Sequence, residues 1–216
     1  IGAYASWCLV TIMYEEVYAL YIAEPLAKGG LAFTSLEIGT ILSLSGIIQV
    51  VSQLIAFPIF EKRFGLLGTF RIASLLLSIF SFLLPFTTDF AFFLGAGQSP
   101  TFSYSPSQKT SVSVLLFLLL AGKTLATVIG YIPVIIFVND SAPNPQSLGT
   151  VHGTGQVFAS LVRSIGPTLG GFLWSWSLQP SHSIPFDFHF TWFFTSGLCL
   201  GCWYASFSLE KIVKKC

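Results

Sequence analysis

Long stretches without charged residues constrain this chain more than any other feature. Residues 38–60, 72–88 and 188–209 contain no Asp, Glu, Lys or Arg. Three further apolar stretches are interrupted only by Glu15 with Glu16, by Lys123 and by Arg163. A helix needs about 20 apolar residues to cross a bilayer core of about 30 Å. Because the apolar runs do not alternate as membrane strands do, the sequence predicts six membrane-spanning helices, at roughly 4–23, 38–60, 66–88, 112–138, 148–178 and 188–209.

The composition excludes several other classes of protein. Only 9% of the 216 residues are charged, whereas soluble domains carry about 25%. The 22 Phe residues argue against disorder, the four Cys against a disulfide scaffold, and the net charge of +1 against nucleic-acid binding. We therefore expect an all-α polytopic membrane protein, with residues 1–216 forming a single six-helix bundle in the lipid bilayer.

No motif in the sequence indicates an enzyme. A phosphate-binding glycine loop ending in Lys-Ser/Thr is absent, and so is a Gly-x-Ser-x-Gly elbow. No set of His, Cys and acidic residues has the spacing of a metal site. We expect no catalytic residues, cofactor or metal.

The basic residues predict the orientation, because short cytosolic loops are enriched in Lys and Arg. One face of the predicted bundle collects six of them and the other face two, Lys28 and Lys109. The six are Lys62, Arg63, Arg71, Lys211, Lys214 and Lys215. This arrangement predicts a multi-pass integral membrane protein with both ends of this segment in the cytosol.

Three expectations concern connections and helix ends. Residues 87–111 are rich in Gly, Ser and Pro, without periodicity, and predict a long outer loop. Pro167 predicts a kink in the long fifth span, because proline removes a backbone donor. The chain begins almost inside its first span without an initiator Met, so we expect further residues upstream.

Two motifs resemble those of the major facilitator superfamily of transporters. The fifth span carries Gly153 and then Gly166-Pro167-Thr-Leu-Gly170-Gly171. This is similar to the glycine–proline motif of proton-coupled antiporters, although Val162 stands where that motif has another Gly. The segment Glu61-Lys-Arg63-Phe-Gly65, with Arg71, resembles a degraded copy of the superfamily's basic loop, with Lys62 in place of the usual aspartate.

The wider chain resembles the carboxyl-terminal half of fungal drug:proton antiporter-type members, a family that includes the zinc-induced facilitator-like group. The similarity runs from Tyr14-Glu15-Glu16 through Gly29-Gly30 to Ile38-Gly39-Thr40, and again from Asn139 to Gly153. It implies half of a twelve-helix transporter that works by alternating access. Its implied partners are a small molecule, protons, and a missing amino-terminal half or a second copy. The alternatives are a non-transporting or truncated membrane protein, structural or receptor-like, and a facilitator without coupling.

Charges inside predicted spans are the main functional candidates, because burying one in a bilayer costs at least about 2.5–3.5 kcal/mol. In the first hypothesis Glu15 or Glu16 carries the coupled proton; the alternative is a structural pair with Lys123 or Arg163. In the second hypothesis Lys123 or Arg163 contacts an anionic substrate or a carboxylate of the missing half. The alternative there is that the side chain reaches to the membrane interface.

Four polar residues are weaker candidates. Gln49 and Gln53 are four residues apart and share a helix face, as do His152 and Gln156. Such faces line a cavity or hold two helices together.

Overall fold

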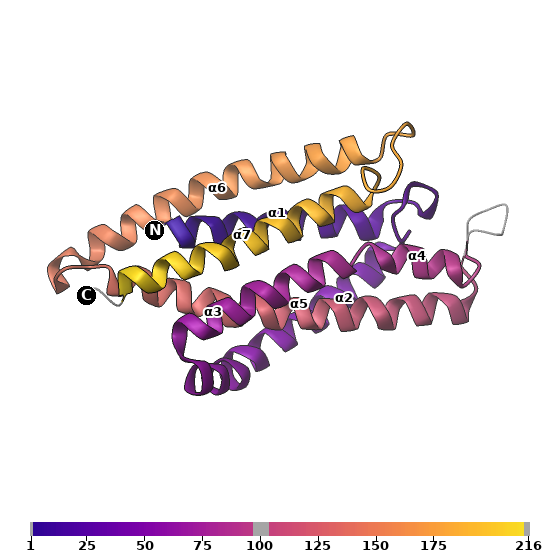
Figure 1. Cartoon of the computed structure of the whole chain (residues 1–216). Coiled ribbons are helices and arrows are strands. Elements are labelled where there is room, and N and C mark those ends of the chain that lie inside the picture. The colour runs from indigo at the N-terminus through magenta and orange to yellow at the C-terminus, as the bar shows by residue number, and fades with distance from the viewer. Residues whose placement is uncertain (1, 97–103, 214–216) are drawn as a thin grey trace.

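The computed structural model describes residues 2–96 and 104–213, of which the side chains are described up to residue 208, and this part of the chain is built from helices without strands (Figure 1). Lys214 and Lys215, which contribute to the predicted orientation, lie outside the described residues. Short 3-10 turns cover Leu26–Lys28 and Pro145–Ser147, and a π-helical turn covers Ser52–Ala56. The α-helices are α1 (Gly2–Ala23), α2 (Ser35–Val51), α3 (Phe57–Leu83), α4 (Phe86–Phe93), α5 (Pro106–Asp140), α6 (Leu148–Ser177) and α7 (His189–Val213).

Local sequence signals explain where several helices begin and turn. Thr34 and Glu37 form a capping box at the start of α2, in which the Thr34 amide donates to Glu37 Oε2 at 2.8 Å. Ser105 and Gln108 do the same at the start of α5. Gly65 interrupts α3 near its start, with φ 68° and ψ 173°. This conformation is essentially restricted to glycine, and the chain reverses there (Figure 1).

The core of the bundle is organised around α1 and α3. Helix α1 packs along α6 and against α7, and α3 packs along α5 and α7. The buried residues of α1 are Tyr4, Trp7, Cys8, Val10, Met13, Tyr14, Val17, Tyr18, Tyr21 and Ile22. Helix α2 lies at the edge, against α5, and buries only Ile41. Helix α1 begins and α7 ends towards the same end of the bundle, on the left in Figure 1.

One segment differs from the expectations. The predicted outer loop 87–111 contains helix α4 and the first turns of α5, so the prediction of an irregular segment is wrong for 87–93 and 106–111. The Tyr21 hydroxyl holds α4 in place by bonding to Thr87 Oγ1 at 2.7 Å and Thr88 Oγ1 at 2.8 Å. Eight residues are too few to reveal the amphipathic pattern of α4 in the sequence. Pro167 lies inside α6, and the kink there stays a prediction.

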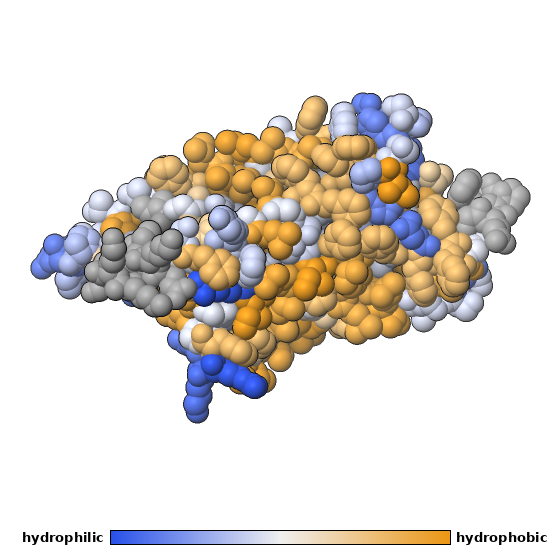
Figure 2. Space-filling model, viewed as in Figure 1, coloured by the Kyte–Doolittle hydropathy of each residue, from blue (hydrophilic) through white to orange (hydrophobic). Residues whose placement is uncertain are grey.

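Two helical stretches of the described chain are long and apolar enough to cross a membrane, judged by length and composition. They are 35–93, which includes α2, α3 and α4, and 106–140, which is α5. Helices α1, α6 and α7 contain more Gly, Ser, Thr, Tyr and Trp, residues of low hydropathy that are nevertheless common at membrane-helix interfaces. Figure 2 shows apolar side chains over the middle of the visible face and hydrophilic ones towards its ends. Six crossings remain a prediction.

Candidate functional site

A buried ion pair joins α5 to α1. Lys123 Nζ on α5 contacts Glu15 Oε1 on α1, and the two side chains are 3% and 50% exposed. The Lys123 ammonium also lies 4.4 Å from the centre of the Tyr14 ring, where a cation–π interaction adds to the attraction. Of the two adjacent glutamates, therefore, Glu15 is the partner of the buried lysine.

The ion pair lies at a polar cavity of about 240 Å³. Helices α1, α2 and α5 all contribute to the wall, so the cavity brings together three of the residues singled out in the sequence: Glu15, Gln49 and Lys123. The complete lining is Glu15, Leu42, Ser45, Gln49, Leu120, Lys123, Thr124, Thr127 and Val128. The half-exposed carboxylate of Glu15 is thus accessible from a space lined by hydroxyl and amide groups.

A second polar cluster joins α1, α5 and α6. The hydroxyls of Tyr4 and Tyr131 lie 3.5 Å apart, and Gln156 Nε2 donates to the Tyr4 hydroxyl at 3.2 Å. Arg163 Nη2 lies 3.8 Å from Cys8 Sγ. Among the described residues Arg163 has no carboxylate partner, and its surroundings are neutral hydrogen-bonding groups.

The two clusters lie along one helix face. Lys123, Thr127 and Tyr131 are spaced four residues apart on α5 and therefore point to the same side. From Lys123 to Tyr131 this face extends about 12 Å along the axis. We call the combined set the polar stripe: Tyr4, Cys8, Glu15, Gln49, Lys123, Thr127, Tyr131, Gln156 and Arg163. The sequence interpretation missed Thr127 and Tyr131, although their spacing from Lys123 was a visible signal.

Three candidates lie outside this stripe. Glu16 is exposed and has no ion-pair partner in the described part of the chain. Gln53 is exposed in the π-helical turn and, unlike Gln49, does not line the polar cavity. His152 Nε2 contacts Asn139 Oδ1 and so ties the start of α6 to the end of α5.

The glycine motif divides into packed and open positions. A Cβ at Gly166 would overlap Ile12 of α1, and one at Gly170 would lie 3.1 Å from Val17 Cγ2. These two glycines permit α1 and α6 to approach closely. A Cβ at Gly153 or Gly171 would meet nothing within 4 Å.

The basic-loop motif (Arg63, Gly65 and Arg71) has a structural role in the described residues. Gly65 supplies the positive φ at the chain reversal. Arg71 Nε donates to Ser206 Oγ at 3.2 Å, and its guanidinium lies 4.1 Å from the centre of the Phe207 ring, which connects α3 to α7. Arg63 is exposed and lies 5.6 Å from the Phe64 ring.

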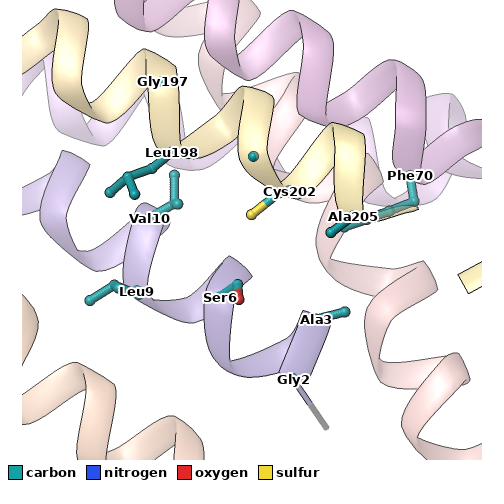
Figure 3. Close-up of a pocket in the computed structure, with 11 residues that line it drawn as sticks. Gly2, Ala3, Ser6, Leu9, Val10, Phe70, Gly197, Leu198, Cys202 and Ala205 are labelled. Carbon is teal, nitrogen blue, oxygen red and sulfur yellow. The ribbon is translucent and has the colours of Figure 1, made fainter. Parts of the chain in front are cut away.

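A larger cavity between α1 and α7 has a different character. It measures about 490 Å³, and Figure 3 shows small and apolar side chains of both helices around it, with Phe70 of α3 at one end. Ser6 and Cys202 are its polar side chains, and it contains no charged one. This cavity therefore offers no charged side chain to a substrate or a proton. Among the described residues, no three His, Cys, Asp or Glu side chains gather to hold a metal ion.

Comparison with known proteins finds transporters. A probable peptide/nitrate transporter of Arabidopsis thaliana is 29% identical over 174 residues, covering 81% of this chain and 32% of the relative. A major facilitator superfamily multidrug transporter of Aspergillus fumigatus, mfsB, is 25% identical, with 98% of this chain and 33% of the relative covered. Zinc induced facilitator 1 of Arabidopsis thaliana is 26% identical, with coverage of 81% and 32%.

The chain therefore spans about a third of the length of the curated relatives it matches. No family model matches the sequence, and no solved structure does.

Proposed function

We propose that this chain, a relative of major facilitator superfamily transporters, is one six-helix half of a secondary transporter that moves a small molecule by alternating access, in exchange for protons. Transporters of this type are built from two six-helix halves around a central site. Coverage of about a third of each relative leaves room for the second half. The observation that carries the proposal is the ion pair between buried Lys123 and half-exposed Glu15.

The pair supports proton coupling because its two members differ in access. A proton that arrives from the cavity can reach the carboxylate of Glu15, which is 50% exposed, whereas the Lys123 side chain is only 3% exposed. Protonation neutralises the carboxylate and leaves the lysine charge buried. Removing one partner of a buried pair costs about 3–5 kcal/mol, and the exposure of Glu15 lowers that figure here. Proton binding therefore favours a rearrangement of α1 against α5.

Arg163 supports a role for the stripe in binding substrate. Its neighbours Cys8, Tyr4 and Tyr131 carry no formal charge, so the guanidinium is available to an anionic group. That group belongs either to the substrate or to a carboxylate of the second half, as an Arg binds both in the same bidentate geometry.

The test compares Glu15→Gln with Glu16→Gln in the full-length protein, reconstituted in liposomes with an imposed pH gradient. The relatives' names supply the probes: a fluorescent drug (ethidium), nitrate and a dipeptide. We expect the gradient to accelerate flux of at least one probe in the wild type. Glu15→Gln should abolish this acceleration while leaving exchange without a gradient, and Glu16→Gln should retain it.

The combined swap Glu15→Lys with Lys123→Glu separates coupling from structure. It restores an ion pair but moves the carboxylate to the buried α5 position. If pH-driven flux survives in Glu15→Gln, or is fully restored by the swap, the pair is structural and the coupling role is wrong. Flux that ignores the pH gradient in the wild type would instead indicate an uncoupled facilitator.

A further inference from the structure

A histidine at the start of α7, at the opposite end of the bundle from the chain reversal at Gly65, lies between two carboxylates. His189 Nδ1 lies 2.7 Å from Asp187 Oδ1, and His189 Nε2 lies 3.0 Å from Asp89 Oδ2. The imidazole is only 3% exposed, whereas Asp89 is 45% and Asp187 21% exposed. None of these residues belongs to the polar stripe.

Asp187 determines the state of one ring nitrogen. Its Oδ1 also accepts the backbone N–H of His189 at 3.1 Å, which caps the start of α7. A carboxylate oxygen that accepts two bonds requires a proton on Nδ1. The other nitrogen, Nε2, then presents either a lone pair or a second proton to Asp89.

A lone pair facing a carboxylate at 3.0 Å would be repulsive, so this contact requires one more proton. The contact is therefore attractive only when Nε2 carries a proton. The rings of Phe86, Phe188 and Phe193 surround the imidazole, with centroids 5.6, 4.1 and 5.8 Å away, and their faces favour a cation.

The other charged groups at this end are engaged elsewhere. Lys28 pairs with Glu24 at 3.2 Å, and Lys109 of α5 pairs with Glu37 of α2 at 2.6 Å. The neighbouring helices α1, α3 and α6 present uncharged partners, such as Tyr14 against Trp192 and Ser78 against Ser196. Among the described residues, Asp89 and Asp187 are thus the charged groups in contact with His189.

Helix α4 connects this histidine to the rest of that end. Thr88 Oγ1 of α4 donates to the Gly29 carbonyl at 3.0 Å, and Tyr21 of α1 bonds to Thr87 and Thr88. Gln108 of α5 donates to the Leu94 carbonyl just after α4 at 2.7 Å. The contact between Asp89 and His189 adds α7 to this set of neighbours.

We propose that Asp89, His189 and Asp187 form a proton-binding site that fastens α4 to the start of α7 when His189 carries protons on both ring nitrogens. Loss of the Nε2 proton turns the Asp89 contact from attractive to repulsive and releases α4 from α7. The site thereby makes the closure of this end depend on the pH of the adjoining compartment, independently of the proton-coupling role proposed for Glu15.

The test measures melting temperature against pH in the full-length protein in lipid nanodiscs, for the wild type and Asp89→Asn. An asparagine can turn either its oxygen or its NH₂ group towards Nε2, and so satisfies both states of the ring. From acidic to alkaline pH we expect the wild type to lose about 1 °C more than Asp89→Asn, the shift that about 1 kcal/mol produces in a protein about three times the length of this chain. His182→Gln is the matched control, since His182 contacts the Trp176 ring and should leave the wild-type loss unchanged.

An equal pH-dependent loss in the wild type and Asp89→Asn would overturn the proposal. Should Asp89→Asn not fold, ¹⁵N spectra of the histidine rings decide the matter, with the His189 signals assigned by their absence in His189→Gln. We expect both ring nitrogens to be protonated at acidic pH and Nε2 to lose its proton as the pH rises. An Nε2 that is unprotonated throughout contradicts the proposed site.

Discussion

Helices α1 and α2 are both apolar, yet the fold uses them in opposite ways. Ten of the 22 residues of α1 are buried, whereas α2 buries one residue of 17, Ile41. Helix α1 is enclosed by α5, α6 and α7, while α2 rests on α5 and leaves Leu36, Ile47 and Val50 at 81%, 63% and 57% exposure. The comparison teaches that apolar character alone predicts a membrane environment and does not predict which helix forms the core.

The difference also bears on the proposed transporter. A helix with nearly all of its apolar surface uncovered needs either lipid or a second six-helix half as its neighbour. The open glycines of α6, Gly153 and Gly171, belong to the same kind of uncovered surface. Substitutions in α1, at the contact between α1 and α6 (the α1–α6 seam) and on α2 therefore test whether the buried core contributes more to the free energy of unfolding than the uncovered surface does.

The largest effect is expected in the core of α1. Trp7 is fully buried, lies against Phe70 with ring centres 5.4 Å apart, and fits over Gly130. Trp7→Ala should lower the free energy of unfolding by about 3–5 kcal/mol because it leaves a large cavity. Reversible unfolding in mixed detergent micelles measures this; a loss below 1 kcal/mol would mean that α1 is not a core helix.

An intermediate effect is expected at the α1–α6 seam. Gly166→Ala places a Cβ against Ile12, a stiff β-branched side chain, and should lower the free energy of unfolding by about 1–3 kcal/mol. The matched control is Gly171→Ala, where the added methyl meets nothing and a helix gains up to about 1 kcal/mol from the better helix former. Equal effects of the two variants would show that α1 and α6 do not approach closely here.

The smallest effect is expected on α2. Ile47→Ala removes a side chain that is 63% exposed, so the unfolding free energy of this chain should change by no more than about 0.5 kcal/mol. In the full-length protein the same variant reports on the neighbour of α2, through the unfolding midpoint. A loss comparable to that of Trp7→Ala in this chain alone would contradict the edge position of α2.

Much of the architecture was predictable because it follows from local patterns. Charge gaps predicted helices over the stretches that became α1, α2 with the first turns of α3, the remainder of α3, α5, α6 and α7. A glycine in the basic loop motif became the chain reversal, since a positive φ is local information carried by Gly65 itself. Helix α4 escaped prediction because its eight residues are held by Tyr21, which is more than 60 residues away along the chain.

The site divides in the same way. From the sequence alone, Glu15, Glu16, Lys123 and Arg163 were candidates, because a charge in an apolar stretch is costly wherever it lies. The sequence could not say which glutamate meets Lys123, because adjacent residues on a helix point about 100° apart and the choice depends on how α1 is rotated against α5. Only tertiary packing decided that Glu15 takes that position and that His189 lies between Asp89 and Asp187. The contact between Glu15 and Lys123 joins residues 108 positions apart, and the contact between Asp89 and His189 joins residues 100 positions apart.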